Sequence, residues 1–158
     1  MYTFRKDDGF TLIEVMIAIV VIVIGILSLY SMQVRSVEEN YRANRMTVAS
    51  TWNSSMVERF IGMKFSDASL KDNDGDGTGQ DGNKDGVDDD GGNFGLDDAT
   101  NATADGMSTT SDNKYTIYWN VAVDVPMPNL KTIRVIIQDN KNVLRQPVVF
   151  TYIKDDLI

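Results

Sequence analysis

The sequence predicts an α+β protein in which a long N-terminal helix packs on a small antiparallel sheet. An apolar run, Met16 to Leu27, leads into a proline-free stretch, and three segments near the C-terminus alternate apolar and polar residues. Periods of 3.6 and 2 residues distinguish helix from strand. The expected parts are a leader (1–9), an apolar helical half (10–30), an amphipathic helical half (31–65), an Asp/Gly-rich loop and linker (66–112) and a sheet (113–158).

The segment from Phe10 to Tyr30 is long enough to cross a membrane. At the rise of an α-helix it spans about 31 Å, which matches a hydrocarbon core of roughly 30 Å. Arg5 and Lys6 precede it, and positive charge there keeps this end in the cytoplasm. The remainder of the chain is therefore expected outside the cytoplasm. The same apolar run would also suit an uncleaved anchor, or a secretory signal cut near Ser28 and Ser31.

One carboxylate, Glu14, lies near the start of this apolar segment. Such a group costs from a few to more than ten kcal/mol at the centre of a bilayer, and less near its surface. Either Glu14 lies at headgroup depth, or a cation pairs with it. A cut between Gly9 and Phe10 would supply that cation, because Phe10 would then carry a free α-amino group.

The stretch K-D-D-G-F-T-L-I-E-V, followed by an apolar helix, resembles the class III signal of type IV pilins and type II secretion pseudopilins. The resemblance implies that a prepilin peptidase cuts after Gly9, that Phe10 becomes N-methylated, and that Glu14 is the assembly carboxylate. It implies three further partners: other pilin subunits, the inner-membrane pilus assembly machinery, and membrane lipid before assembly. The expected location is a single pass in the inner membrane, then an extracellular pilus or a periplasmic pseudopilus.

The continuation from Gly25 to Val34, and M-V-E-R-F at 56–60, are similar to PilV-type minor pilins. Ser31 stands where many major pilins carry a helix-bending proline. The resemblance implies a minor pilin that joins a type IV pilus or primes its assembly. Two alternatives are a type II secretion pseudopilin and a calcium-dependent adhesin on an uncleaved membrane anchor.

The helix is expected to continue to about Lys64, because no proline interrupts it. Apolar residues recur along it at steps of three, four and seven, which defines one helical face: Val34, Val37, Tyr41, Val48, Trp52, Met56 and Phe60. We expect the second half of this face to cover the sheet, with Trp52 and Phe60 in the core. Arg45 and Arg59 lie near the same arc, so the stripe is imperfect.

Composition limits the possible functions. The chain has no histidine and no cysteine, which removes the commonest general base and every disulfide. The resemblance makes the second absence a departure, because many pilins close their last segment with a disulfide. No phosphate-binding G-x-x-x-x-G-K motif occurs either. Enzyme activity is therefore not expected.

The net charge of −8 is concentrated in one segment. Residues 71–98 contain ten aspartates and two lysines, so the remainder of the chain is neutral. This distribution argues against nucleic-acid partners.

Within this segment, D-N-D-G-D-G at 72–77 and D-G-N-K-D-G at 81–86 follow the pattern D-x-[DN]-x-[DN]-G. Alternate oxygens at this spacing fold around one hard cation, and the glycine permits the turn. The pattern departs from an EF-hand, because Asn83 and Gly92 replace the closing glutamate. Short aspartate-rich calcium loops fit better, with these candidate ligands: Asp72, Asp74, Asp76, Thr78, Asp81, Asn83, Asp85, Val87 and Asp89. The alternative is a solvated linker without a metal.

Three strands are expected after residue 113. Residues 114–125 and 130–138 alternate, with Ile117 and Ile133 each on the apolar face of its segment. Residues 143–153 form the third, in which Pro147 indicates an edge strand or a bulge. Residues 93–112 are rich in small and polar side chains and are assigned to a loop.

Overall fold

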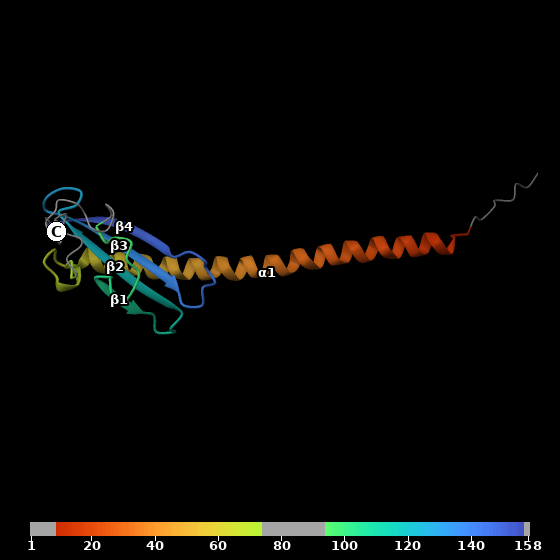
Figure 1. The fold of residues 1–158 in the computed structure, drawn as a ribbon, viewed down its shortest axis with the longest axis horizontal. Helices are drawn as coiled ribbons and strands as arrows, with labels where there is room; N and C mark the ends of the chain where they lie inside the picture. The colour runs from red at the N-terminus through yellow and green to blue at the C-terminus, as the bar shows by residue number, and fades with distance from the viewer. Residues whose placement is uncertain (1–8, 74–93, 157–158) are drawn as a thin grey trace, which may run out of the picture. The chain divides into compact units, whose positions relative to one another are not determined.

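The computed structural model describes residues 9–73 and 94–156. A long helix, α1 (Leu12–Gly62), is followed by a short 3-10 helix, η1 (Ala68–Leu70), and by the strands β1 (Gly106–Thr109), β2 (Tyr115–Val123), β3 (Leu130–Asp139) and β4 (Val148–Asp155). The strands form one antiparallel sheet in the order β1-β2-β3-β4. Figure 1 shows this sheet beside the C-terminal part of α1. The predicted α+β class is confirmed.

The chain divides into two compact units, Met1–Tyr41 and Arg42–Ile158, and α1 contributes to both. We call the second unit the head. In the first unit, the large apolar side chains from Leu12 to Tyr30 expose between 46% and 81% of their surface. In the head, one face of α1 is buried. The two parts of α1 therefore present their apolar side chains to different surroundings.

The sheet presents one apolar face to α1. Successive side chains of a strand point to opposite faces, so the odd-numbered residues of β2 and β3 lie together. The register pairs Ile117 with Ile137 and Val121 with Ile133, and all four are buried. The predicted faces of these two strands are confirmed.

The core forms where this face meets the helix. It comprises Ala49, Met56, Val57, Phe60, Leu70, Tyr115, Ile117, Val121, Ile133, Val135 and Ile137. The ring of Phe60 packs against that of Trp119, with centroids 5.5 Å apart. Burying one large apolar side chain stabilises a fold by about 1.5–3 kcal/mol. These contacts supply the main attraction between the helix and the sheet.

The predicted apolar stripe on the helix is only partly correct. Met56 and Phe60 are buried, but Trp52 remains 37% exposed and is not a core residue. Val34, Val37, Tyr41 and Val48 are also exposed. The buried face instead follows Arg45, Ala49, Asn53, Met56, Val57 and Phe60. The prediction missed this face because it considered only apolar residues, whereas the buried face includes an arginine and an asparagine.

Strand β1 lies in the region that the sequence assigned to a loop, so that assignment is wrong for 106–109. Gly106 pairs with Trp119 of β2, and a Cβ atom at Gly106 would overlap the indole ring. The indole Nε1 donates to the carbonyl of Ser69, 3.0 Å away. G-M-S-T has no apolar alternation, which explains why the sequence did not reveal this strand.

The last strand begins later than expected. β4 starts at Val148, directly after Pro147, and the predicted strand start at 143 is wrong. Asp139 to Asn142 form a turn, and the chain remains irregular up to Pro147. β4 is an edge strand, which confirms one of the two positions expected from the proline.

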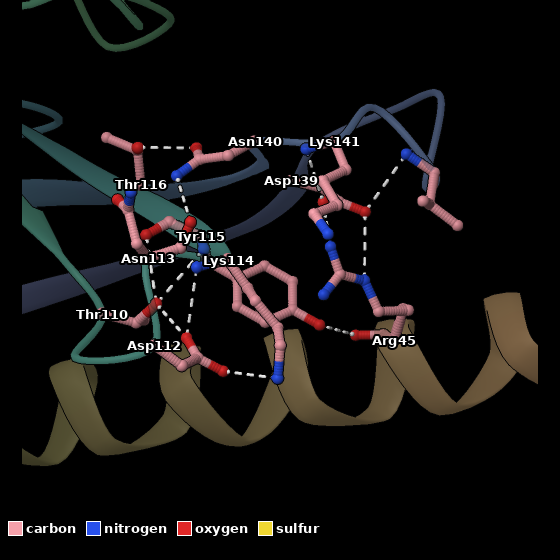
Figure 2. A network of polar contacts seen from close by, with 11 residues as sticks. Arg45, Thr110, Asp112, Asn113, Lys114, Tyr115, Thr116, Asp139, Asn140 and Lys141 are labelled. Carbon is pink, nitrogen blue, oxygen red and sulfur yellow. Dashed lines mark hydrogen bonds and ion pairs between the residues drawn. The ribbon is translucent and has the colours of Figure 1, made fainter.

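A buried ion pair joins α1 to the end of β3 (Figure 2). The guanidinium of Arg45 binds both carboxylate oxygens of Asp139, and these side chains are 5% and 0% exposed. The amides of Lys141 and Val143 donate to the same carboxylate, at 3.0 and 3.2 Å. Tyr115 packs its ring 4.7 Å from the guanidinium carbon and donates its hydroxyl to the carbonyl of Arg45. These contacts connect α1 to β2, to the end of β3 and to the turn that follows it.

Two buried lysines bind backbone carbonyls at the C-terminal end of α1 and in the segment that follows it. Lys131 and Lys154 are cross-strand partners and are 6% and 4% exposed. Lys154 donates to the carbonyl of Ile61 at 2.9 Å, and Lys131 donates to those of Phe65 and Leu70 at 2.8 and 2.7 Å. The end of a helix carries unpaired carbonyls and partial negative charge, which an ammonium group stabilises. Burial lowers the pKa of Lys131.

We expect Gly106→Ala to lower the free energy of unfolding by about 1–3 kcal/mol, because the added methyl group forces Trp119 to move. Urea denaturation of the full chain in detergent micelles, followed by tryptophan fluorescence, measures the change. Gly62→Ala is the control, since no atom lies within 4 Å of a Cβ at that position. Equal midpoints for Gly106→Ala and the wild type would contradict the close packing.

The Arg45–Asp139 pair predicts a loss of stability in acid. Burial raises the pKa of Asp139, but hydrogen bonds from the Lys141 amide and from Arg45 outweigh it, so the pKa lies below 3.8. The carboxylate therefore contributes its full stabilisation above 3.8, and this is lost as the pH falls through the lower folded value.

Asp139→Asn should cost about 3–5 kcal/mol near neutral pH, because it removes the negative charge that Asp139 places beside the buried guanidinium of Arg45. In this variant the free energy of unfolding should decrease less steeply as the pH falls below 3.8, the ordinary pKa of an aspartate. Part of the fall will remain, since hydrogen bonds from Lys114 and Thr110 hold the pKa of Asp112 at about 2. Urea denaturation at a series of pH values tests this, with the exposed Asp156→Asn as the control. An unchanged acid profile in Asp139→Asn would contradict the assignment.

Candidate functional site

The peptide bond between Gly9 and Phe10 lies in an exposed, non-helical segment directly before α1. Phe10 exposes 82% of its surface, and a Cβ at Gly9 would meet nothing within 4 Å. The helix begins two residues later, at Leu12. The predicted processing residues are therefore accessible and lie outside regular secondary structure, the form that a peptidase can bind.

Thr11 caps the start of the helix. Its hydroxyl accepts a hydrogen bond from the amide of Glu14 at 3.3 Å, and its carbonyl accepts from the amides of Glu14 and Val15. T-L-I-E has the spacing of a capping box, in which the threonine satisfies an amide that the helix leaves unpaired. This role of Thr11 was not predicted, although the T-x-x-E spacing could have revealed it.

Glu14 occupies the first turn of α1. The amide end of a helix carries partial positive charge, which favours a carboxylate there. The side chains around it along the helix are apolar and exposed, including Ile13, Val15 and Ile17. The site therefore combines an acidic group, a helix N-terminus and an apolar surface within two turns.

This part of α1 is long and apolar enough to cross a membrane, judged by length and composition. Its most apolar window lies near the N-terminus, and none of it is buried within the chain. A membrane, or other apolar helices, would cover these side chains.

Comparison with known proteins adds one match at this site. Residues 4–30 match the prokaryotic N-terminal methylation motif. Gly9, Phe10 and Glu14 all fall inside the matched range. The match supports a precursor of the type IV pilin or pseudopilin kind, a family of structural subunits processed by prepilin peptidase. No curated protein and no solved structure matches the chain.

Only one of the nine candidate calcium ligands lies within the described residues. Asp72 is described, whereas the other eight lie outside the described residues: Asp74, Asp76, Thr78, Asp81, Asn83, Asp85, Val87 and Asp89. Within residues 9–73 and 94–156, no three acidic side chains are placed to hold a metal ion. The calcium site therefore stays a prediction.

Asn73 and Asp98, near the two ends of the acidic segment, are connected through one set of hydrogen bonds beside the sheet. Asn73 donates its backbone amide to a carboxylate oxygen of Asp105 and its side-chain amide to the Asp105 carbonyl, 2.7 Å away. Asp105 in turn accepts from the amide of Val121 and donates its own amide to Asn120. Asn120 is 2% exposed and donates to the carbonyl of Asp98 at 2.8 Å. Asp105 and Asn120 therefore link Asn73 to Asp98 through hydrogen bonds beside β2.

Proposed function

We propose that the chain is a minor pilin, a structural or assembly-priming subunit of a type IV pilus. The observation that carries the proposal is the methylation motif at residues 4–30, together with the exposed Gly9–Phe10 bond directly before the helix. Prepilin peptidase would cut this bond and methylate the new amino group of Phe10. The helix behind it would then enter the filament.

Glu14 has a specific task in this proposal. A carboxylate and an ammonium group are each costly in an apolar medium, and pairing them recovers much of that cost. The amine of Phe10 and the carboxylate of Glu14 are four residues apart on one chain. A pair formed between neighbouring subunits would therefore set how far each helix slides along the next.

The uninterrupted helix at Ser31 supports a place among the minor pilins of the PilV type. At Ser31, where many major pilins carry proline, α1 continues without interruption. The Ser31 hydroxyl donates to the carbonyl of Ser28 at 2.8 Å, which a proline could not do. A type II secretion pseudopilin carries the same signal and is the nearest alternative. Neighbouring genes for pilus or secretion components would distinguish the two.

We expect Glu14→Ala to be processed normally but to enter filaments poorly, because the amine of its neighbour loses its partner. Intact mass should show the loss of nine leader residues and the gain of one methyl group in both proteins. Immunoblots of sheared filaments measure incorporation, and Glu38→Ala, on the same helix, is the control.

Two results would contradict the proposal at different points. A wild-type chain that retains Met1 and no methyl group would exclude pilin processing and favour an uncleaved, membrane-anchored adhesin. Normal incorporation of a processed Glu14→Ala chain would exclude only the pairing mechanism.

We also propose that the acidic segment after Asp72 binds calcium as a structural ion. The repeated D-x-[DN]-x-[DN]-G spacing supplies the oxygen ligands. The contacts of Asn73 with Asp105 and of Asp98 with Asn120 support it further, because a segment whose ends are already held together loses less entropy when it folds around an ion. Calcium outside the cell is plentiful, so weak sites suffice.

Calcium should bind the full chain in detergent micelles and raise its melting temperature. A ligand that binds only the folded state stabilises it by about 2.7 kcal/mol at 100 times its Kd. Isothermal titration with calcium chloride measures the binding. Asp74→Asn with Asp85→Asn should abolish the heat, and Asp156→Asn is the control. No heat and no change in melting temperature for the wild type would overturn the calcium site.

A further inference from the structure

Two flanks of α1 remain exposed in the head, one on each side of its buried face. Successive residues turn by 100° around a helix. Trp52 and Arg59 lie on one flank, together with Val48 and Ser55, and we call these four residues the aromatic flank. Ser54 lies about 160° from Trp52 at this spacing, on the side of the helix that meets β4. The two flanks are therefore different surfaces.

The flank next to β4 contains a pocket of about 200 Å³. We call it the edge pocket, and it is lined by Ser54, Val57, Glu58 and Phe150. Phe150 exposes half of its surface although it lies on the face of the sheet that packs on α1. β4 is an edge strand, so no further strand of the described residues covers this side.

The charges of the two surfaces are complementary. Glu58 lines the edge pocket and has no ion-pair partner among residues 9–73 and 94–156. Arg59 belongs to the aromatic flank and is exposed. The pKa of Asp67 is lowered mainly by the backbone amide of Ser69, and the charge of Arg59 adds to this. If the same flank met itself in two copies, Arg59 would face Arg59 or Glu58 would face Glu58. Unlike flanks instead bring opposite charges together.

The axial positions of these groups on α1 are also compatible with a contact between two parallel copies. Residues 52–59 span about 10 Å along the axis. Copies that share one membrane or one filament through their N-terminal segment run in the same direction. A parallel neighbour displaced by less than one turn can therefore place Trp52 at the pocket and Arg59 near Glu58 together.

We propose that the aromatic flank of one copy of this chain packs into the edge pocket of a parallel second copy. Trp52 would contact Ser54 and Phe150, and Arg59 would pair with Glu58. Aromatic side chains bury large areas, and Trp and Arg are the residues most enriched at such contacts. Because unlike surfaces meet, the contact does not close on itself and can repeat along an assembly. The common direction of the copies rests on the proposed function.

Cross-linking tests this contact directly, because the chain has no cysteine of its own. Ser55→Cys places a thiol on the aromatic flank and Ser54→Cys places one at the edge pocket, and both leave Trp52 and Phe150 intact. Full-length chains carrying one change each are mixed in micelles and oxidised. The mixed pair should form a disulfide dimer at least about fivefold more readily than either variant alone, since a disulfide requires Cα atoms within about 7 Å.

A matched control uses the next residue on β4. Thr151→Cys points to the opposite face of the sheet from Phe150, so its pairing with Ser55→Cys should give only background. Equal yields with Thr151→Cys, or a Ser55→Cys chain that links best to itself, would overturn the proposal. No dimer in any mixture would also overturn it.

Variants that exchange the two charges distinguish a loss of the contact from a general loss of folding. Glu58→Arg or Arg59→Glu alone should lower the yield of the mixed dimer about fivefold, and both changes in every copy should restore it. Melting temperatures confirm that each variant folds. The mass of the processed chain, measured in parallel in cells, reports on pilin processing. A failed cross-link with normal processing therefore rejects only this interface.

Discussion

The head depends on one contact, the burial of a single face of α1 on a single face of the sheet. Ala49, Met56 and Phe60 meet the inward-facing residues of β2 and β3, and each large side chain removed from water adds about 1.5–3 kcal/mol. Alternation along the strands leaves the other face of the sheet to different uses. Asn120 on that face binds the carbonyl of Asp98. One face thus supplies stability while the other holds a connecting segment.

Buried charged groups fix the position of the helix along this apolar contact. Arg45 binds Asp139 toward one end of the contact, and Lys154 binds the carbonyl of Ile61 at the other. Desolvation makes such groups poor sources of net stability, but their hydrogen bonds have fixed geometry. Apolar side chains alone would allow the helix to slide along the sheet. The charged groups define its axial position, and with it the placement of Trp52 and Glu58 on the exposed flanks.

The N-terminal segment of α1 is not buried within the chain. Its apolar side chains are exposed in the single chain, and an exposed apolar surface of this kind is typical of a membrane or protein interaction surface. Thr11 caps the helix, and Glu14 follows in its first turn. The same short stretch therefore starts the helix and carries the group that we propose to select the neighbour. In this proposal the helix cap and the assembly group lie three residues apart, which is why a short motif identifies the region.

Local pattern was enough to determine the α+β class, the apolar helix, two of the strands and the motif around Gly9, Phe10 and Glu14, because each depends on residues close together in the chain. The acidic repeat after Asp72 predicts calcium in the same way and stays a prediction. Only the tertiary structure revealed β1, the partial exposure of Trp52 and the burial of Arg45. Asp139 lies 94 residues from Arg45, and Gly106 begins β1 where a side chain would overlap the ring of Trp119. Such features depend on which distant residues come into contact, and sequence periodicity contains no record of those contacts.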